Sequence, residues 1–92
     1  MAKRISDYIK ELPTHPTEDI IDKDMIFHDF KVVEGKKGPY MRAKVEDPQT
    51  HNMMTVLIGG KVVMEKLTDM KIAGNLPIVG CIFKTDDYYD IK

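Results

Sequence analysis

The sequence predicts a mainly β domain with five strands, one helix between the third and fourth strands, and a short N-terminal helix. Three observations support this class. Residues 40–46, YMRAKVE, alternate between apolar and polar side chains, as a half-buried strand does. Runs rich in β-branched and aromatic residues occur on both sides of this segment and again near residue 80. The 92 residues hold one domain with one core, and their apolar fraction of 42% is ordinary for a globular chain.

Residues 1–23 are expected to form a short helix and a connector that precede the main domain at 24–92. Ile5, Ile9 and Leu12 recur at i, i+4 and i+7, which is one helical stripe. The stretch LPTHPTED follows, and its two prolines predict an irregular connection.

The first strand of the predicted domain is MIFHDFKVV, at residues 25–33. It is rich in aromatic and β-branched residues and has no helical stripe. Strict alternation would place Ile26, His28, Phe30 and Val32 on one face. The turn EGKKGP then leads to the second strand.

The second and third strands are YMRAKVE and MMTVLI. In YMRAKVE, the side chains expected to face the core are Met41, Ala43 and Val45, and those expected to face outward are Tyr40, Arg42, Lys44 and Glu46. In MMTVLI, the more apolar set is placed inward, and this set is Met54, Val56 and Ile58. Met53 and Thr55 would then lie beside the outer side of the second strand, with His51 in the adjoining turn.

The remaining elements are a helix and a hairpin. Val63, Leu67 and Met70 form an apolar stripe in the predicted helix at 61–70. IVGCIFK, at 78–84, is the fourth strand, and YYDIK is a short fifth strand. Tyr89 shares a side with an isoleucine two residues later and is placed inward, so Tyr88 points outward.

Three strands, a helix and a hairpin, in that order, are the elements of the OB-fold, a five-stranded Greek-key barrel whose second and third strands commonly form a binding face. The alternative is another small α+β domain with helices on one face of a sheet.

Positive charge is concentrated in one segment of a nearly neutral chain. Residues 31–44 contain five cations and one carboxylate, +4 in total; since the chain carries −1, the other residues carry −5. One interpretation is a solvated hairpin whose lysines protect a sheet edge from aggregation. The other is a local binding surface for phosphates, because the chain as a whole has no field that would attract nucleic acid.

Four segments carry a resemblance to a known family. They are GKKGPYMRAKVED, TVLIGGKVVMEKL, LPIVGCIFK and YYDI. Over residues 24–92 the chain resembles the small OB-fold single-stranded DNA-binding proteins of phage and microbial replication. Similar chains often carry a hydroxyl residue where the third strand meets the helix, whereas this chain has Gly59 and Gly60. A contact from that position is therefore not inferred.

The resemblance implies non-catalytic, largely sequence-independent binding of single-stranded DNA in replication or recombination. The residues support this, because a cationic surface with flat side chains can neutralise phosphates and stack on bases. The candidate contacts are Lys36, Lys37, Tyr40, Arg42, Lys44, His51, Met53, Thr55 and Tyr88. Two alternatives stay open: RNA binding by the same face, and an OB-like protein-interaction module or assembly subunit whose hairpin contacts an acidic partner.

No catalytic residue, metal site or cofactor is expected. The histidines and Cys81 have none of the spacings of a zinc site, and no complete phosphate-binding loop occurs. A single cysteine in an apolar strand suits a reducing cytoplasm. No apolar run is long enough to span a membrane. Because short hairpins limit how far one barrel wraps a strand, a homodimer or a cooperative array on the DNA is expected.

Overall fold

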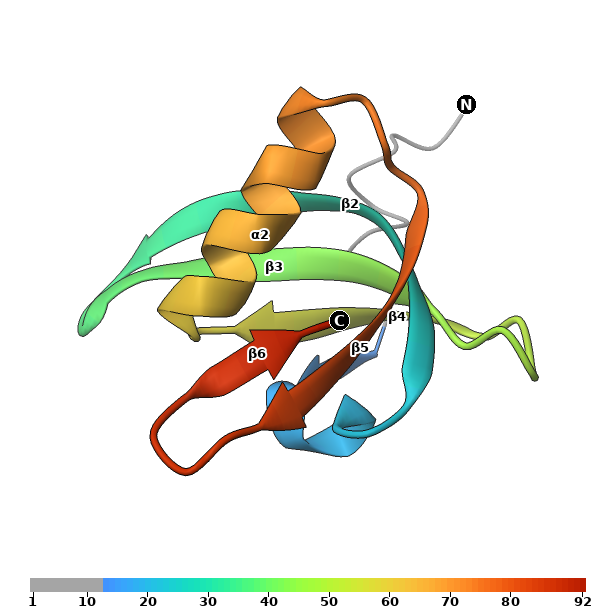
Figure 1. The fold of residues 1–92 in the computed structure, drawn as a ribbon, viewed down its shortest axis with the longest axis horizontal. Helices are drawn as coiled ribbons and strands as arrows, with labels where there is room; N and C mark the ends of the chain where they lie inside the picture. Colours follow the sequence, from blue (N-terminus) through green and yellow to red (C-terminus); the bar gives the residue numbers. More distant parts are fainter. Residues whose placement is uncertain (1–12) are drawn as a thin grey trace, which may run out of the picture.

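The computed structural model describes residues 13–92, so the helix predicted over residues 5–12 lies outside the described residues. The fold is a curled, half-barrel sheet with one α-helix (Figure 1). The strands are β1 (Thr14–Pro16), β2 (Asp24–Gly35), β3 (Gly38–Glu46), β4 (Met53–Ile58), β5 (Ile78–Lys84) and β6 (Tyr89–Ile91), in the sheet order β1-β4-β3-β2-β5-β6. The 3-10 helix η1 (Thr17–Ile20) follows β1, and α2 (Lys61–Ile72) lies between β4 and β5.

The sheet has six strands where five were predicted. The additional strand is β1, which falls in the stretch predicted to be irregular and pairs in parallel with β4. The backbone N–H of Thr55 donates to the carbonyl of Pro13 at 2.9 Å, and the Thr17 hydroxyl donates to the carbonyl of Leu57 at 2.7 Å. Pro13 precedes β1, and Pro16 is tolerated as its last residue because β1 is an edge strand of the described sheet, where a missing N–H donor costs no ladder bond. With β1 included, the helix lies between the fourth and fifth strands in chain order.

The core lies on the concave side of the sheet, where α2 crosses in front of β2 and β3 (Figure 1). Val63 and Leu67 of the helix are buried in the core, as their spacing predicts. The sheet contributes the other large buried side chains, which include Phe27, Met41, Val45, Val56, Ile58 and Ile82.

A β-bulge in β2 changes which residues face the core. The pairing of β2 with β3 shifts between Phe27 and Asp29, so the alternation reverses at this point. Before the bulge, Met25 and Phe27 are buried, and Ile26 is not; after it, Phe30 packs against the core. The prediction that Ile26 shares a face with Phe30 is therefore wrong, because strict alternation assumes an uninterrupted ladder.

The far half of the β2–β3 hairpin extends beyond the rest of the sheet. The pairing of β2 with β5 runs from Asp24 to Phe27 and ends there. The pairing of β2 with β3 continues to the pair formed by Gly35 and Gly38. Gly38 has a φ of 116°, a conformation that L side chains rarely adopt, and it closes the turn. In Figure 1 this hairpin reaches out on the left, past the end of α2.

A candidate nucleic-acid interface

The outward side of β3 carries the aromatic and cationic residues that the alternation predicts. Met41, Ala43 and Val45 are fully buried. Arg42 and Lys44 are exposed, and Tyr40 is half-buried. Since α2 lies on the concave side, the opposite, outer side of β3 is not covered by the helix (Figure 1).

The neighbouring strands extend this surface. Residues opposite each other in antiparallel strands point to the same side of the sheet. On β2, Lys31 is opposite Arg42, Val33 is opposite Tyr40 and Asp29 is opposite Lys44. On β4, Leu57 is opposite Arg42 and Met53 is opposite Glu46. We use the term outer face for the side chains of Lys31, Val33, Tyr40, Arg42, Lys44, Met53 and Leu57.

The outer face and the hairpin tip together carry five cations, which are Lys31, Lys36, Lys37, Arg42 and Lys44. Among residues 13–92, the lysines that form ion pairs are Lys66 and Lys71, which bind Asp90 and Asp29. No ion pair within this part of the chain involves Lys31, Arg42 or Lys44, nor the exposed Lys36 and Lys37 of the turn.

The ring of Tyr40 rests on the backbone of Gly35. A Cβ atom added to Gly35 would lie 3.0 Å from Cδ1 and 3.1 Å from Cε1 of the ring. Contacts of this length are tighter than most real Cβ contacts, so a side chain at this position would require the ring to shift by a few tenths of an ångström. The hairpin therefore holds the Tyr40 ring against its own backbone.

Thr55 does not contribute to the surface, although it was a predicted contact. The register places it opposite Lys44, on the outer side of the sheet, as expected. However, Thr55 is only 4% exposed, and it also pairs with Thr14 of β1. The prediction assumed that no further strand pairs with β4 beside β3. The strand β1, which was not predicted, pairs with β4 at Thr55.

Tyr88 also lies apart from the outer face. It is exposed, but it belongs to the turn between β5 and β6, at the other end of the strand order from β4. Its backbone N–H and carbonyl both bind the Thr85 hydroxyl. The prediction that Tyr88 points outward and Tyr89 inward is confirmed, since Tyr89 packs against the core.

A hydrogen-bonded cluster adjoins the end of the outer face. His51 donates from Nδ1 to one Glu46 oxygen at 2.9 Å, and His28 donates from Nε2 to the other at 2.7 Å. These bonds, first that of His51 and then that of His28, lower the pKa of the Glu46 carboxyl. His51 was a predicted contact, whereas His28 and Glu46 were not. The alternation of β3 could have identified Glu46, because Glu46 is the last outward residue of that strand.

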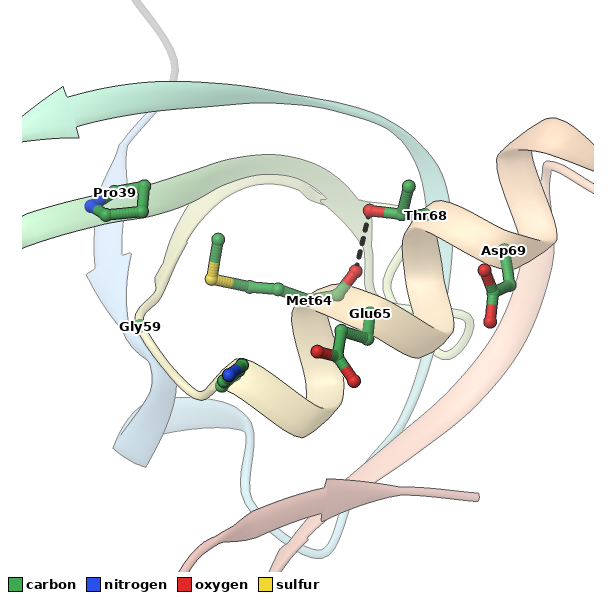
Figure 2. Close-up of a pocket in the computed structure, with 7 residues that line it drawn as sticks. Pro39, Gly59, Met64, Glu65, Thr68 and Asp69 are labelled. Carbon is green, nitrogen blue, oxygen red and sulfur yellow. Dashed lines mark hydrogen bonds between the residues drawn. The ribbon is translucent and has the colours of Figure 1, made fainter.

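A groove lies on the concave side, between α2 and the start of β3. It has a volume of about 480 Å³ and is lined by Pro39, Gly59, Lys61, Met64, Glu65, Thr68 and Asp69. Figure 2 shows the Met64 side chain extending from the helix toward β3, and the Thr68 hydroxyl bound to the Met64 carbonyl at 2.7 Å. The groove and the outer face are thus on opposite sides of the sheet.

Within the described residues, no three side chains of His, Cys, Asp or Glu come together to hold a metal ion. Cys81 is buried and unpaired within residues 13–92. In the same part of the chain, each helix is either too short or too polar to cross a membrane. Comparisons with protein-family models, curated proteins and solved structures found no match to this chain.

Proposed function

We propose that this protein binds single-stranded DNA without catalysis and largely without regard to sequence, in replication or recombination, through the outer face. The observation that carries the proposal is that the half-buried Tyr40 and the exposed Arg42 and Lys44 lie together on a sheet surface that α2 leaves uncovered. The proposed setting is the cytoplasm.

The chemistry of the face suits an unpaired strand. Tyr40 offers a ring on which a base can stack, and each stacked base contributes roughly 1–3 kcal/mol. Arg42 can bind a phosphate in a bidentate manner or stack, and Lys31 and Lys44 add point charges beside it. These contacts use phosphates and base planes, so they distinguish little between sequences.

We also propose that the half-barrel is a variant of the OB-fold. On this reading, β2 to β6 are the five strands of the Greek-key barrel and β1 is an addition. The support is the order of three strands, a helix and a hairpin in residues 24–92. The outer side of β2, β3 and β4 then corresponds to the usual binding side of such barrels.

The test is a titration with oligothymidylate followed by tyrosine fluorescence. The chain has four tyrosines and no tryptophan, so the signal reports on tyrosines alone. We expect quenching, and a binding constant that falls with salt at a log–log slope of about −0.7 for each phosphate contacted. Repeating the titration with an RNA of equivalent sequence tests the RNA alternative. If neither oligonucleotide binds at low salt, the proposal is refuted.

A protein-interaction module is the second candidate. It is favoured by the groove between α2 and Pro39, and by the exposed apolar side chains of Val32, Ile72 and Val79. Apolar surface of this kind often marks a protein contact. This candidate predicts that oligonucleotides do not bind at low salt, whereas the leading proposal predicts that they do.

We propose that the protein acts as a homodimer or as a cooperative array on the strand, because one half-barrel offers a short face. Sedimentation velocity of the free protein and of its complex with a long oligothymidylate distinguishes the two. A homodimer sediments with the mass of two chains in the absence of DNA, whereas a cooperative array forms only when the oligothymidylate is present.

A further inference from the structure

The cluster of His28, Glu46 and His51 continues the outer face at the end of β3. Glu46 is the next outward residue of β3 after Lys44, two positions along the strand. His28 comes from the bulge of β2, and His51 from the turn that precedes β4. Three separate elements therefore place these side chains together, beside the residues of the proposed function.

The cluster holds its two imidazoles in fixed orientations. Both oxygens of Glu46 accept from a histidine, and the carboxyl side chain is only 18% exposed. His51 has a φ of 60°, a conformation that is costly for residues other than glycine. Its N–H donates to the carbonyl of Asp47 at 2.7 Å, which holds the turn in this conformation. The side chain of His51 is nonetheless 78% exposed, so its ring is held but remains accessible.

The hydrogen bonds determine what each ring offers to an anion. Since His51 donates to Glu46 from Nδ1, its Nε2 carries no proton when the ring is neutral, and this nitrogen would repel a phosphate oxygen. A second proton turns Nε2 into a donor. The same holds for Nδ1 of His28, whose Nε2 is bound to Glu46. Histidine is the side chain that ordinarily gains this proton between about pH 8 and pH 5.

Protonation reverses the charge of the cluster. With both rings neutral, the ionised Glu46 gives it a charge of −1; with both rings protonated, the charge becomes +1. The lowered pKa of Glu46 keeps its carboxyl ionised over the range in which histidines titrate.

The charged residues next to the cluster along the chain are Lys44, Asp29 and Asp47. Lys44 precedes Glu46 on β3, and Asp29 follows His28 on β2, where it is bound to Lys71. In the turn, Asp47 accepts a hydrogen bond from the backbone of Gln49.

We propose that His28, Glu46 and His51 form a proton-linked phosphate subsite that extends the outer face beyond Lys44. This inference rests on the proposed function. A bound phosphate favours the protonated rings, so the complex takes up protons and the affinity for a single strand rises as pH falls. Glu46 acts as the positioning residue that orients both rings.

The test measures the dissociation constant for oligothymidylate between pH 8 and pH 5.5 at constant low ionic strength. We expect the affinity to rise about five- to tenfold, as for one added charge-assisted contact at an exposed site. His51→Gln should remove most of this rise, as judged from the ratio of the affinities at pH 5.5 and pH 8 for the variant and for the unmodified protein. Glu46→Gln should strengthen binding at pH 8, because it removes a negative charge, and weaken the pH dependence.

The matched control is His15→Gln. His15 also binds a carboxylate, that of Asp19 at 2.8 Å, but it lies on β1, outside the outer face. This variant should keep the full pH dependence. NMR of the histidine ring protons adds a second readout, in which oligonucleotide at pH 5.5 should shift the ring signals of His51 and leave those of His15 unchanged.

The outcomes separate the two proposals. If the protein binds oligothymidylate with an affinity that does not change with pH, or if His51→Gln retains the full pH dependence, the subsite is refuted and the proposed function stands. If no binding occurs at any pH, the proposed function itself is refuted.

Discussion

At the scale of single residues, the proposed binding through the outer face depends on how Tyr40 is supported. The ring lies against Gly35, on the same hairpin, and not against the core of the domain. Its position is therefore set by local backbone geometry across the turn. A change at Gly35 should disturb binding much more than it disturbs folding.

Gly35→Ala is expected to weaken oligonucleotide binding. The new methyl group would lie 3.0 Å from the Tyr40 ring and 3.1 Å from the carbonyl oxygen of Gly38, so the ring must move. Loss of one stacked base corresponds to roughly 1–3 kcal/mol, and displacement of the ring should cost part of that. Gly59→Ala is the matched control, because a Cβ atom there meets no atom within 4 Å. Equal affinities of the two variants would contradict the role given to Tyr40.

Lys44→Ala is expected to reduce the salt dependence of binding. Removing one phosphate contact should lower the magnitude of the log–log slope by about 0.7. Lys61 provides the control, since it is an exposed lysine that lines the groove on the concave side. Lys61→Ala should leave the slope unchanged, and a change of equal size in both variants would indicate attraction by overall charge alone.

At the scale of elements, the alternation of β3 could be predicted because one strand with one buried side obeys a period of two. The inward Val56 and Ile58 of β4 and the stripe of α2 were predictable for the same kind of reason. The bulge in β2 could not be predicted. Side chains alternate regularly along β2 before and after His28, and the set that faces the core changes only at this residue.

The strand β1 and the histidine cluster were not predictable for another reason. β1 is three residues long and exists through its pairing with β4, a contact between segments about forty residues apart. The pairing of His28 with Glu46 likewise depends on the bulge that turns His28 toward β3. Local patterns contain no information on such contacts.

Gly80→Ala tests the packing of β5 against its neighbours. A methyl group at Gly80 would lie 2.9 Å from Cδ1 of Ile91 and 3.3 Å from Cε1 of Phe27. Overpacking of this kind typically destabilises by about 1–3 kcal/mol. Urea unfolding should show a lower midpoint for Gly80→Ala and an unchanged midpoint for Gly59→Ala. An unchanged midpoint in both would mean that Ile91 can move away freely.

At the scale of the whole molecule, two ion pairs tie α2 to the sheet. Lys71 binds Asp29 of β2 at 2.8 Å, and Lys66 binds Asp90 of β6 at 2.7 Å. The hydrogen bond from each lysine is the main cause that lowers the pKa of its carboxyl partner. Both lysines are about half exposed, although the Asp90 side chain is only 18% exposed, so each pair contributes modestly to stability.

These pairs predict a loss of stability in acid. A carboxyl whose pKa is lowered by folding stabilises the fold above its unfolded pKa of about 4, and this contribution is lost as pH falls through the lowered value. Asp90→Asn should therefore reduce the difference in urea midpoint between pH 7 and pH 2.5. Asp86→Asn, in the exposed turn between β5 and β6, is the control that should preserve the difference. The same difference in both variants would show that the Lys66 pair is not coupled to folding.

The most direct test of the proposed binding surface is to map the bound strand by NMR. Unlabelled oligothymidylate is added to the ¹⁵N-labelled protein, and amide shifts are followed at low and at high salt. If the strand binds the outer face, the largest shifts fall on residues 31–33 and 40–44, and they disappear at high salt. Shifts confined to α2 and the groove beside Pro39, or no shifts at low salt, would contradict it.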